Sequence, residues 1–347
     1  MDALNDVLVV NAGSTSLKLS LVDADERSRT VASLEKAPSV GLVGHRVVHG
    51  GEEFLDPTPI DDAVERKLQE LVELAPLHNA PALAAIEQAR ALLPEAQHVA
   101  VFDTSFHRTI PRAAATYLLP ERYRERGIRR FGFHGLSVQW SAWQVSAARL
   151  VVCHLGGGSS VTAVRDGASV DTSMGFTPLE GVPMPTRAGS FDPGALLYLL
   201  RQDVSMGELD HALEHEAGLK ALAGTDDVEA IERDPGEGAK LALEIYCYRI
   251  AQAIAAMATA LDGLDALVFT AGVGEHSPPI RSAICGRLAF LGVELDEAVN
   301  EQAEGDARID APSSAVAVHV VQAREDVVVA RAVRAVTESA LAAERAT

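Results

Sequence analysis

The sequence predicts an α/β protein made of two duplicated domains with a cleft between them. Two strand–loop–strand units of similar pattern lie about half a chain apart, at residues 7–21 and 150–164. Helical segments separate them, and 347 residues are too many for one small hydrophobic core. The likeness between the units is short and local, so the chemistry of their loops matters more than the repeat itself.

The first unit begins with a short β-branched run at residues 7–10. After a turn-prone loop, leucines alternate with polar residues at 17–21, as in a half-buried strand. This loop joins two strands, whereas a P-loop leads from a strand into a helix and ends in Gly-Lys-Ser/Thr. The second unit has predicted strands at 150–153 and 161–164, and Asp166-Gly167 predicts a hairpin turn before the next strand.

Helices are predicted at residues 63–74 and 80–93, with Pro76 and Pro81 marking their connection. A long apolar, alanine-rich helix at residues 237–261 is expected to lie buried between layers. We predict strands at 266–270 and 316–321, a loop at 271–275 and a closing helix at 326–344. The sequence shows no low-complexity linker, so we expect short, hinge-like connections between the domains.

Composition narrows the possible functions. The formal charge is −19, from 49 acidic and 30 basic residues. So acidic a chain repels nucleic acid and anionic lipid, and neither is an expected partner. The three widely spaced cysteines predict small buried residues in a reducing compartment. We find no signal-peptide pattern and no apolar stretch of bilayer-spanning length, so we expect a soluble, cytoplasmic protein.

Three glycine- and serine-rich loops each follow a predicted strand, at residues 11–16, 154–160 and 271–275. Glycine lets backbone N–H groups approach phosphate oxygens, and serine hydroxyls add donors. One such loop is commonly only a turn, but three in one chain favour phosphate binding. Lys18 follows the first loop closely enough to reach a phosphate, although a surface lysine on a strand fits equally well.

Two arginines and one aspartate are candidate catalytic residues. Arg46 lies in apolar company before a glycine turn, where an arginine is costly unless it meets an anion; a structural ion pair explains it equally well. Arg187 lies in a Gly/Pro loop, and two arginines converging on a cleft would suit a carboxylate and a transferring phosphoryl group. Asp103 ends a strand, where α/β sheets place functional groups, with a helix N-cap as the alternative.

Several loop histidines have Gly, Pro or Asn within two residues: His78, His134 and His154. A lone histidine is more often structural than catalytic.

With these motifs in order, the sequence resembles the acetate kinase family, within the superfamily of acetate and sugar kinases, heat-shock ATPases and actin. The matching blocks lie at residues 11–18, 45–51, 76–79, 102–107, 132–135, 154–160, 171–181 and 269–277. They extend over about residues 7–331. The resemblance implies two ribonuclease H-like (actin-like ATPase) domains, expected at residues 1–103 with 327–347 and at residues 104–326.

On the acceptor side, the resemblance implies that Arg46 and Arg187 clamp the acyl and phosphoryl groups. It implies that Asp103 orients or activates the acceptor carboxylate and that His134 contacts the transferring phosphoryl group. His78 and His154 match histidines that line the cleft. A small pocket for the substrate's methyl group is implied at four retained apolar residues: Val48, Leu77, Phe133 and Pro178.

On the donor side, the resemblance implies Mg²⁺ (or Mn²⁺) near Asn11 and Glu325. Nucleotide-binding residues are implied along the glycine loops and the adenosine segment, at Ser14, Ser16, Lys18, His154, Gly156, Gly157, Gly158, Asp227, Gly272, Val273 and Gly274.

The departures from the family pattern fall mostly on this donor side. Gly157 stands where the family has Asn, Ser190 replaces an Asp and His276 an Asn. Residues 224–229 lack a family arginine that touches the adenosine. The chain is also shortened near residues 25–40 and 139–149.

The expected activity is reversible, Mg²⁺-dependent phosphoryl transfer between ATP and acetate, giving acetyl phosphate and ADP. Propionate or butyrate is an alternative acceptor, because one methylene in an apolar pocket is worth only about 1–3 kcal/mol. Pyrophosphate or another nucleotide is the alternative donor, and a non-catalytic nucleotide-binding module is the alternative from another class. The expected partners are ATP/ADP and a short-chain carboxylate, in a homodimer as is usual in the family.

Overall fold

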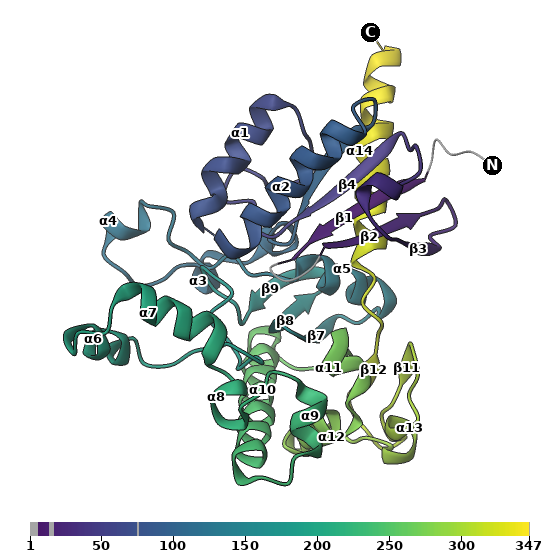
Figure 1. The fold of residues 1–347 in the computed structure, drawn as a ribbon. Coiled ribbons are helices and arrows are strands. Elements are labelled where there is room, and N and C mark those ends of the chain that lie inside the picture. The colour runs from purple at the N-terminus through teal and green to yellow at the C-terminus, as the bar shows by residue number, and fades with distance from the viewer. Residues whose placement is uncertain (1–5, 14–16, 75, 347) are drawn as a thin grey trace. The chain divides into compact units, whose positions relative to one another are not determined.

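The computed structural model describes residues 6–13, 17–74 and 76–346, without the side chains of residues 73–78, 340, 341 and 343–347. The chain divides into two compact units (Figure 1). Unit 1 comprises Met1–Arg108, Phe133–Trp140 and Arg324–Thr347, and unit 2 comprises Thr109–Gly132 and Ser141–Ala323. The division assigns residues 133–140 to unit 1, whereas the boundaries expected from sequence put them in the second domain; those domain boundaries stay a prediction.

Unit 1 is built on a six-stranded sheet in the order β3-β2-β1-β4-β6-β5. Its strands are β1 Val7–Ala12, β2 Leu17–Val22, β3 Ser28–Val31, β4 Leu42–Val47, β5 Thr58–Pro59 and β6 Gln97–Phe102. Its helices are η1 Leu34–Lys36, α1 Asp62–Glu70, η2 Leu71–Leu74, α2 Pro76–Leu92, η3 Ser105–Thr109 and α14 Glu325–Ala346, and α5 Gly135–Gln144 begins in this unit.

Unit 2 has a six-stranded sheet in the order β11-β12-β10-β7-β8-β9. Its strands are β7 Arg149–Leu155, β8 Ser159–Arg165, β9 Ala168–Thr172, β10 Ala266–Thr270, β11 Ala307–Arg308 and β12 Ala317–Val320. Its helices are α3 Arg112–Ala115, α4 Glu121–Arg124, α6 Pro193–Arg201, α7 Met206–His211, η4 Ala212–Glu216, α8 Lys220–Ala223, α9 Val228–Arg233, α10 Glu237–Leu261, α11 Ala271–His276, α12 Pro278–Gly286, η5 Ala289–Leu291 and α13 Glu297–Glu301.

The two sheets share one topology. In each, the first three strands form an antiparallel meander, β1-β2-β3 in unit 1 and β7-β8-β9 in unit 2. The next two strands lie parallel to the first strand, and the sixth is antiparallel at the edge. The duplication predicted from two short loops therefore extends over both sheets.

Helices cover both faces of the unit 1 sheet. Val43 packs in one cluster with Ala82 and Ala85 of α2. The next residue, Gly44, faces α14 instead, because successive strand residues point to opposite faces. A Cβ on Gly44 would lie 2.5 Å from Cγ1 of Val329. Glycine is therefore needed where α14 approaches β4.

The core of unit 2 lies between its sheet and α10. Residues such as Tyr246, Ile250 and Ile254 are fully buried among strand residues. By length and composition α10 could cross a membrane, which corrects the expectation of no such stretch, but one helix of this kind is weak evidence for a membrane span. The expectation that it is buried between layers is also wrong, since Leu241 is 47% exposed and Tyr248 is 46% exposed on its outer side.

Most other predicted elements are confirmed within a few residues. Asp166 and Gly167 both have positive φ, 49° and 80°, as a tight hairpin turn requires. Two details are wrong. Pro81, expected to mark the connection between two helices, lies inside α2, and residues 271–275, predicted as a loop, form most of α11.

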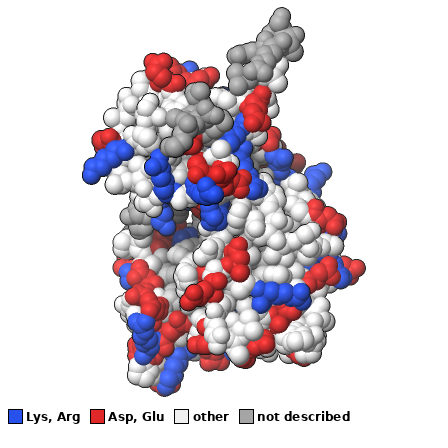
Figure 2. Space-filling model, turned by 90° about the vertical axis from the view of Figure 1, so that its right-hand side faces the viewer, with Lys and Arg blue, Asp and Glu red and all other residues white. Residues whose placement is uncertain are grey.

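The three cysteines, Cys153, Cys247 and Cys285, are buried and free, as their spacing predicted. Acidic side chains are interspersed with Lys and Arg on the face shown in Figure 2. Exposed ion pairs such as Arg27–Asp25, with atoms 3.0 Å apart, contribute at most about 1 kcal/mol each.

Candidate active site

Arg46 and Asp103 lie at neighbouring strand ends in unit 1. Arg46 is in β4, and Asp103 follows β6, the parallel neighbour of β4. Arg46 Nε donates to Asp103 Oδ1 at 3.0 Å, and Nη2 pairs with Oδ2. This two-point geometry is the strong form of an arginine–carboxylate pair. Asp103 therefore serves as a partner for Arg46, and the N-cap alternative is not what the structure shows.

The environment of this pair sets its charge. The Asp103 side chain is fully buried and that of Arg46 is 13% exposed. Burial raises the pKa of Asp103 to about 6; Arg46 opposes the rise and Glu325 adds to it. The backbone N–H of His134 also donates to the carboxylate, which favours its ionised form. The pKa of Arg46 lies above its usual value because Asp103 and Glu325 outweigh the effect of burial.

Asn11 and Glu325 extend the cluster. Asn11 lies opposite Arg46 in the β1–β4 pairing. Arg46 Nη1 donates to Asn11 Oδ1 at 3.0 Å, and Asn11 Nδ2 donates to Glu325 Oε2 at 3.4 Å. Glu325 begins α14 and lies 3.6 Å from Arg46 Nε. Asp103 and Asn11 together occupy three of the five N–H groups of Arg46, so two have no partner among the described residues and can bind an anionic ligand.

This part of the site suits a hard divalent cation that is held mainly by the phosphates of a bound nucleotide. Among the described residues no group of three or more His, Cys, Asp or Glu side chains could hold a metal. Glu325 nevertheless supplies a carboxylate beside Asn11, whose amide nitrogen faces Glu325 while its amide oxygen accepts from Arg46. Mg²⁺ is commonly bound by one or two carboxylates together with water and substrate phosphates. Glu325 therefore fits Mg²⁺ bound with a nucleotide, whereas the part predicted for Asn11 in metal binding stays a prediction, because its amide oxygen is turned to Arg46.

His134 and Phe133 are brought to Asp103 by a close backbone contact. Gly135 N donates to Asp103 O at 3.0 Å, and a Cβ on Gly135 would lie 2.0 Å from that oxygen. His134 adopts a left-handed φ of 58°, which is strained for a non-glycine residue and common at functional sites. The Phe133 ring lies edge-on to His49, with centroids 5.5 Å apart. Arg46, Asp103, Phe133 and His134 are thus placed in one region of unit 1.

Asn79 supports this region, and the sequence reasoning did not single it out. Its side chain accepts from His49 N and donates to His49 O, both at 3.1 Å. It therefore fixes the turn after β4, which carries the buried Val48. The predicted Leu77 and His78 side chains, and the predicted Ser14 and Ser16, lie outside the described residues. Lys18 lies opposite Asn11 across β1 and β2 and is exposed.

The predicted glycine loops of unit 2 meet one another. A Cβ on Gly156 would lie 3.5 Å from Cβ of Ala271 and 3.8 Å from N of Gly272. The loop at Gly156–Gly158, which follows His154, therefore lies beside the start of α11, which holds Gly272, Val273 and Gly274. Ala271 itself has a positive φ of 66°. The neighbouring Thr270 was missed: its Oγ1 is buried and makes no hydrogen bond to a described residue.

Asp227 has a structural role in the same unit. It is exposed, and its carboxylate caps α9 by accepting from the backbone N–H groups of Glu229 and Ala230. Its predicted part in nucleotide binding stays a prediction.

Arg187 and Pro178 are in direct contact. Arg187 Nη1 donates to Pro178 O at 3.2 Å, and Arg187 Nε lies 3.8 Å from Glu214 Oε2. Burial lowers the pKa of Arg187, with Glu214 opposing. The pKa of a guanidinium lies so far above neutral pH that Arg187 remains charged. Because this cation is mostly buried, binding a further anion would stabilise it.

Unit 1 and unit 2 each carry the same mixed sheet, and together they define an actin-like ATPase fold with two domains. The chain belongs to the acetokinase family, whose model matches residues 26–331. It is 46% identical to an acetate kinase of Synechococcus sp. (strain JA-2-3B'a(2-13)), over 86% of this chain and 77% of that one. It is 45% identical to an acetate kinase of Nostoc punctiforme, with the same coverage.

Solved structures agree with these relatives. A propionate kinase from Francisella tularensis matches with a TM-score of 0.88 and 32% identity, over 95% of this chain and 99% of that one. The acetate kinase from Entamoeba histolytica matches with a TM-score of 0.85 and 32% identity, over 94% and 98%.

Proposed function

We propose that this protein catalyses reversible, Mg²⁺-dependent phosphoryl transfer between ATP and acetate, giving acetyl phosphate and ADP. The observation that carries the proposal is the buried Arg46–Asp103 pair beside Asn11 and Glu325, in a member of the acetokinase family. A pure binding module has no use for a buried, two-point arginine–aspartate pair that leaves guanidinium N–H groups available.

Transfer to a carboxylate requires positioning and charge neutralisation more than covalent chemistry by the protein. Asp103 fixes the plane of the Arg46 guanidinium, and the remaining N–H groups bind acyl or phosphoryl oxygens. The same role is proposed for Arg187, and His134 donates to the transferring group. Bound Mg²⁺ would neutralise charge on the nucleotide phosphates, held there by Asn11 and Glu325. Charge that develops on the equatorial oxygens is thereby stabilised.

The test traps acyl phosphate with hydroxylamine. Purified protein receives acetate and Mg²⁺ with ATP, GTP or pyrophosphate in parallel. We expect signal with ATP and its loss in Arg46→Ala and Asp103→Ala. Arg90→Ala is the matched control, because Arg90 is also ion-paired in unit 1, with Asp62 at 2.9 Å, but lies outside the site. Folded protein that gives no signal with any donor or short-chain acid contradicts the proposal and favours the binding module.

The phosphoryl donor is the less constrained substrate. Gly157, at the centre of its loop, has open space around it, because a Cβ on this residue would meet no atom within 4 Å. ATP is proposed as the donor. If acyl phosphate formed only with pyrophosphate or only with GTP, that compound would be the donor instead. For the acceptor, comparing kcat/KM for acetate, propionate and butyrate decides chain-length preference. The likeness to a propionate kinase structure makes propionate the alternative to measure first.

A homodimer is proposed from the apolar surface of α6. None of its residues is buried, and Leu197 and Tyr198 are 53% and 61% exposed. A surface helix of this kind is usually covered by a partner. Sedimentation of wild type and Tyr198→Glu tests this: we expect a dimer that the variant weakens. We also propose a cytoplasmic location, supported by the free, buried cysteines.

A further inference from the structure

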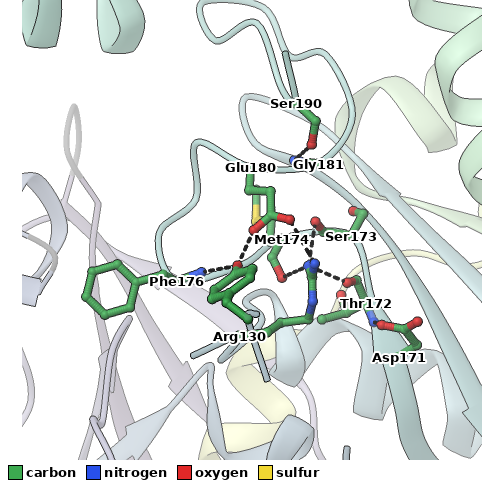
Figure 3. Close-up of polar contacts among 10 residues, drawn as sticks. Arg130, Asp171, Thr172, Ser173, Met174, Phe176, Glu180, Gly181 and Ser190 are labelled. Carbon is green, nitrogen blue, oxygen red and sulfur yellow. Dashed lines mark hydrogen bonds and ion pairs between the residues drawn. The ribbon is translucent and has the colours of Figure 1, made fainter. Parts of the chain in front are cut away.

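Arg130 lies at the centre of a polar cluster in unit 2 that none of the predicted roles uses. Its Nη1 donates to three consecutive backbone carbonyls, those of Thr172, Ser173 and Met174, at 2.9, 3.0 and 2.9 Å (Figure 3). Its Nη2 donates to Glu180 Oε1 at 2.8 Å. One side chain therefore holds both ends of the segment that runs from the end of β9 to Glu180.

Tyr117 adds two further contacts to the same segment. Its hydroxyl donates to Glu180 Oε2 and accepts from Phe176 N at 3.1 Å. Gly175 leaves the necessary space, since a Cβ there would lie 1.6 Å from Glu180 Oε2 and 2.1 Å from the Tyr117 hydroxyl oxygen. We call Tyr117, Arg130, Gly175 and Glu180 the Arg130 cluster. Such convergence of a charge, a hydroxyl and a glycine on one segment fixes its path.

The segment held by the Arg130 cluster carries acceptor-side residues. Pro178, predicted to line the methyl pocket, lies within it, and Arg187 donates to the Pro178 carbonyl. Past Glu180, Gly181 N donates to Ser190 Oγ at 3.0 Å (Figure 3). Gly181 O accepts from Ser190 N at 2.8 Å. The loop that holds Arg187 is therefore closed onto the same segment.

The geometry points to Arg130 as a positioning residue that sets the place of Pro178 and Arg187, and hence acceptor affinity and chain-length preference. This inference rests on the proposed function. Arg130 acts through the backbone of residues 172–181 and through Glu180, and it touches no substrate. Loosening the segment should widen the site for the acyl chain while leaving the glycine loops at Gly156 and Gly272 in place.

The experiment compares Arg130→Lys and Tyr117→Phe with wild type. Lysine keeps the charge but cannot reach three carbonyls and a carboxylate with one planar group, and phenylalanine removes only the hydroxyl. We expect KM for acetate to rise about five- to tenfold in Arg130→Lys, in keeping with the loss of one or two hydrogen bonds. The acetate-to-propionate ratio of kcat/KM should shift toward propionate by about threefold or more. KM for ATP should stay within about twofold.

The matched control is Arg165→Lys, at the end of β8, where the arginine also donates to a backbone carbonyl, that of Ala260 at 2.9 Å. It should change neither KM nor the ratio. If Arg130→Lys does not fold, Tyr117→Phe still tests the inference. Its changes in acetate KM and in the acetate-to-propionate ratio should have the same direction and be smaller. An unchanged acetate KM and an unchanged ratio in a folded variant overturn the inference.

Hydrogen exchange separates this inference from the proposed function, because it needs no turnover. Peptides covering residues 172–190 should exchange faster in both variants than in wild type and Arg165→Lys. Unchanged exchange overturns the positioning role. If wild type forms no acyl phosphate with any donor, the proposed function is overturned. Any role of Arg130 in that reaction is then overturned too, whatever the hydrogen-exchange result.

Discussion

Arg46 and Asp103 form a two-point ion pair in which the carboxylate is fully buried and the guanidinium keeps access to solvent. The buried partner fixes the orientation, and the accessible partner can bind a ligand. The pair thus combines the two interpretations of Arg46 that the sequence left open, a structural ion pair and an anion-binding residue.

The pair predicts an acid limb in the pH profile. Burial raises the pKa of Asp103 to about 6. Below that pH, Asp103 takes up a proton and can no longer accept from two N–H groups of Arg46. We expect kcat/KM for acetate to fall as the pH drops through about 6. In Asp103→Asn, kcat/KM should be about 10²–10³-fold lower and lack this limb. Asp62→Asn, which changes an exposed aspartate paired with Arg90, should keep the wild-type kcat/KM and the acid limb. A limb that persists in Asp103→Asn assigns it to another group.

A buried histidine pair predicts that acid destabilises unit 1. His45 Nε2 and His98 Nδ1 are 2.9 Å apart, and His45 Nδ1 has no hydrogen-bond partner among the described residues. Burial lowers the pKa of His45 to about 3, and that of His98 is also lowered by burial. The unfolded chain therefore binds more protons below pH 6.5, so stability is present above that pH and is lost as the pH falls.

From pH 7 to pH 5, His45 alone should remove about 2 kcal/mol from the free energy of unfolding. Denaturant unfolding at the two pH values measures this. His45→Gln should show the smaller loss, while His211→Gln, at a side chain 63% exposed, should behave as wild type. Equal losses of unfolding free energy in wild type and His45→Gln would contradict the assignment of this pH dependence to His45.

Glu325 predicts a change in metal dependence. Its carboxylate lies at the start of α14 beside Asn11 and Arg46. In Glu325→Gln we expect the Mg²⁺ concentration for half-maximal activity to rise about tenfold, in line with one lost charged ligand. Asp326→Asn is the control, because Asp326 belongs to the same helical turn and interacts with Arg324 at 3.7 Å. An equal effect in both variants would indicate only a change in the charge of the helix terminus.

Gly157 predicts that one departure from the family can be reversed without structural cost. A Cβ at Gly157 meets nothing within 4 Å, and the residue is exposed. Gly157→Asn should leave the melting temperature unchanged and lower KM for ATP about two- to tenfold, the value of one hydrogen bond. A rise in KM would show that asparagine obstructs the donor in this protein. Gly175→Ala is the contrasting variant, since its Cβ would collide with Glu180, and it should unfold at lower temperature.

Local sequence patterns were sufficient to predict the strands and to place candidate residues at their ends. Alternating leucines predicted β2, and Asp103 was placed at the end of β6 because an apolar run ends there. Local context made Arg46 and Asp103 candidates and the resemblance gave them roles, but their contact depends on β4 and β6 being neighbours, which no local pattern states.

Other features depend on partners distant in the chain. Arg130 binds residues 42 to 50 positions away, so nothing near it in the sequence marks it. Pro76 and Pro81 were expected to mark the connection between two helices. Pro76 instead occupies the first position of α2, where a proline is tolerated, and Pro81 lies inside that helix. The exposed side of α10 could not be predicted either, because its apolar residues continue around the helix.

The hydrogen bond between Asn11 and Glu325 joins residues 314 positions apart. During synthesis, the ribosome must release the chain as far as α14, at residues 325–346, before this helix can reach β1 and β4. Most of unit 2, at residues 141–323, is continuous and emerges earlier, so it can fold first as a unit. The nascent chain therefore carries an unfinished unit 1 until residues 325–346 have been released. Premature termination anywhere before residue 325 yields a protein that can fold in part but lacks Glu325 beside Asn11 and Arg46.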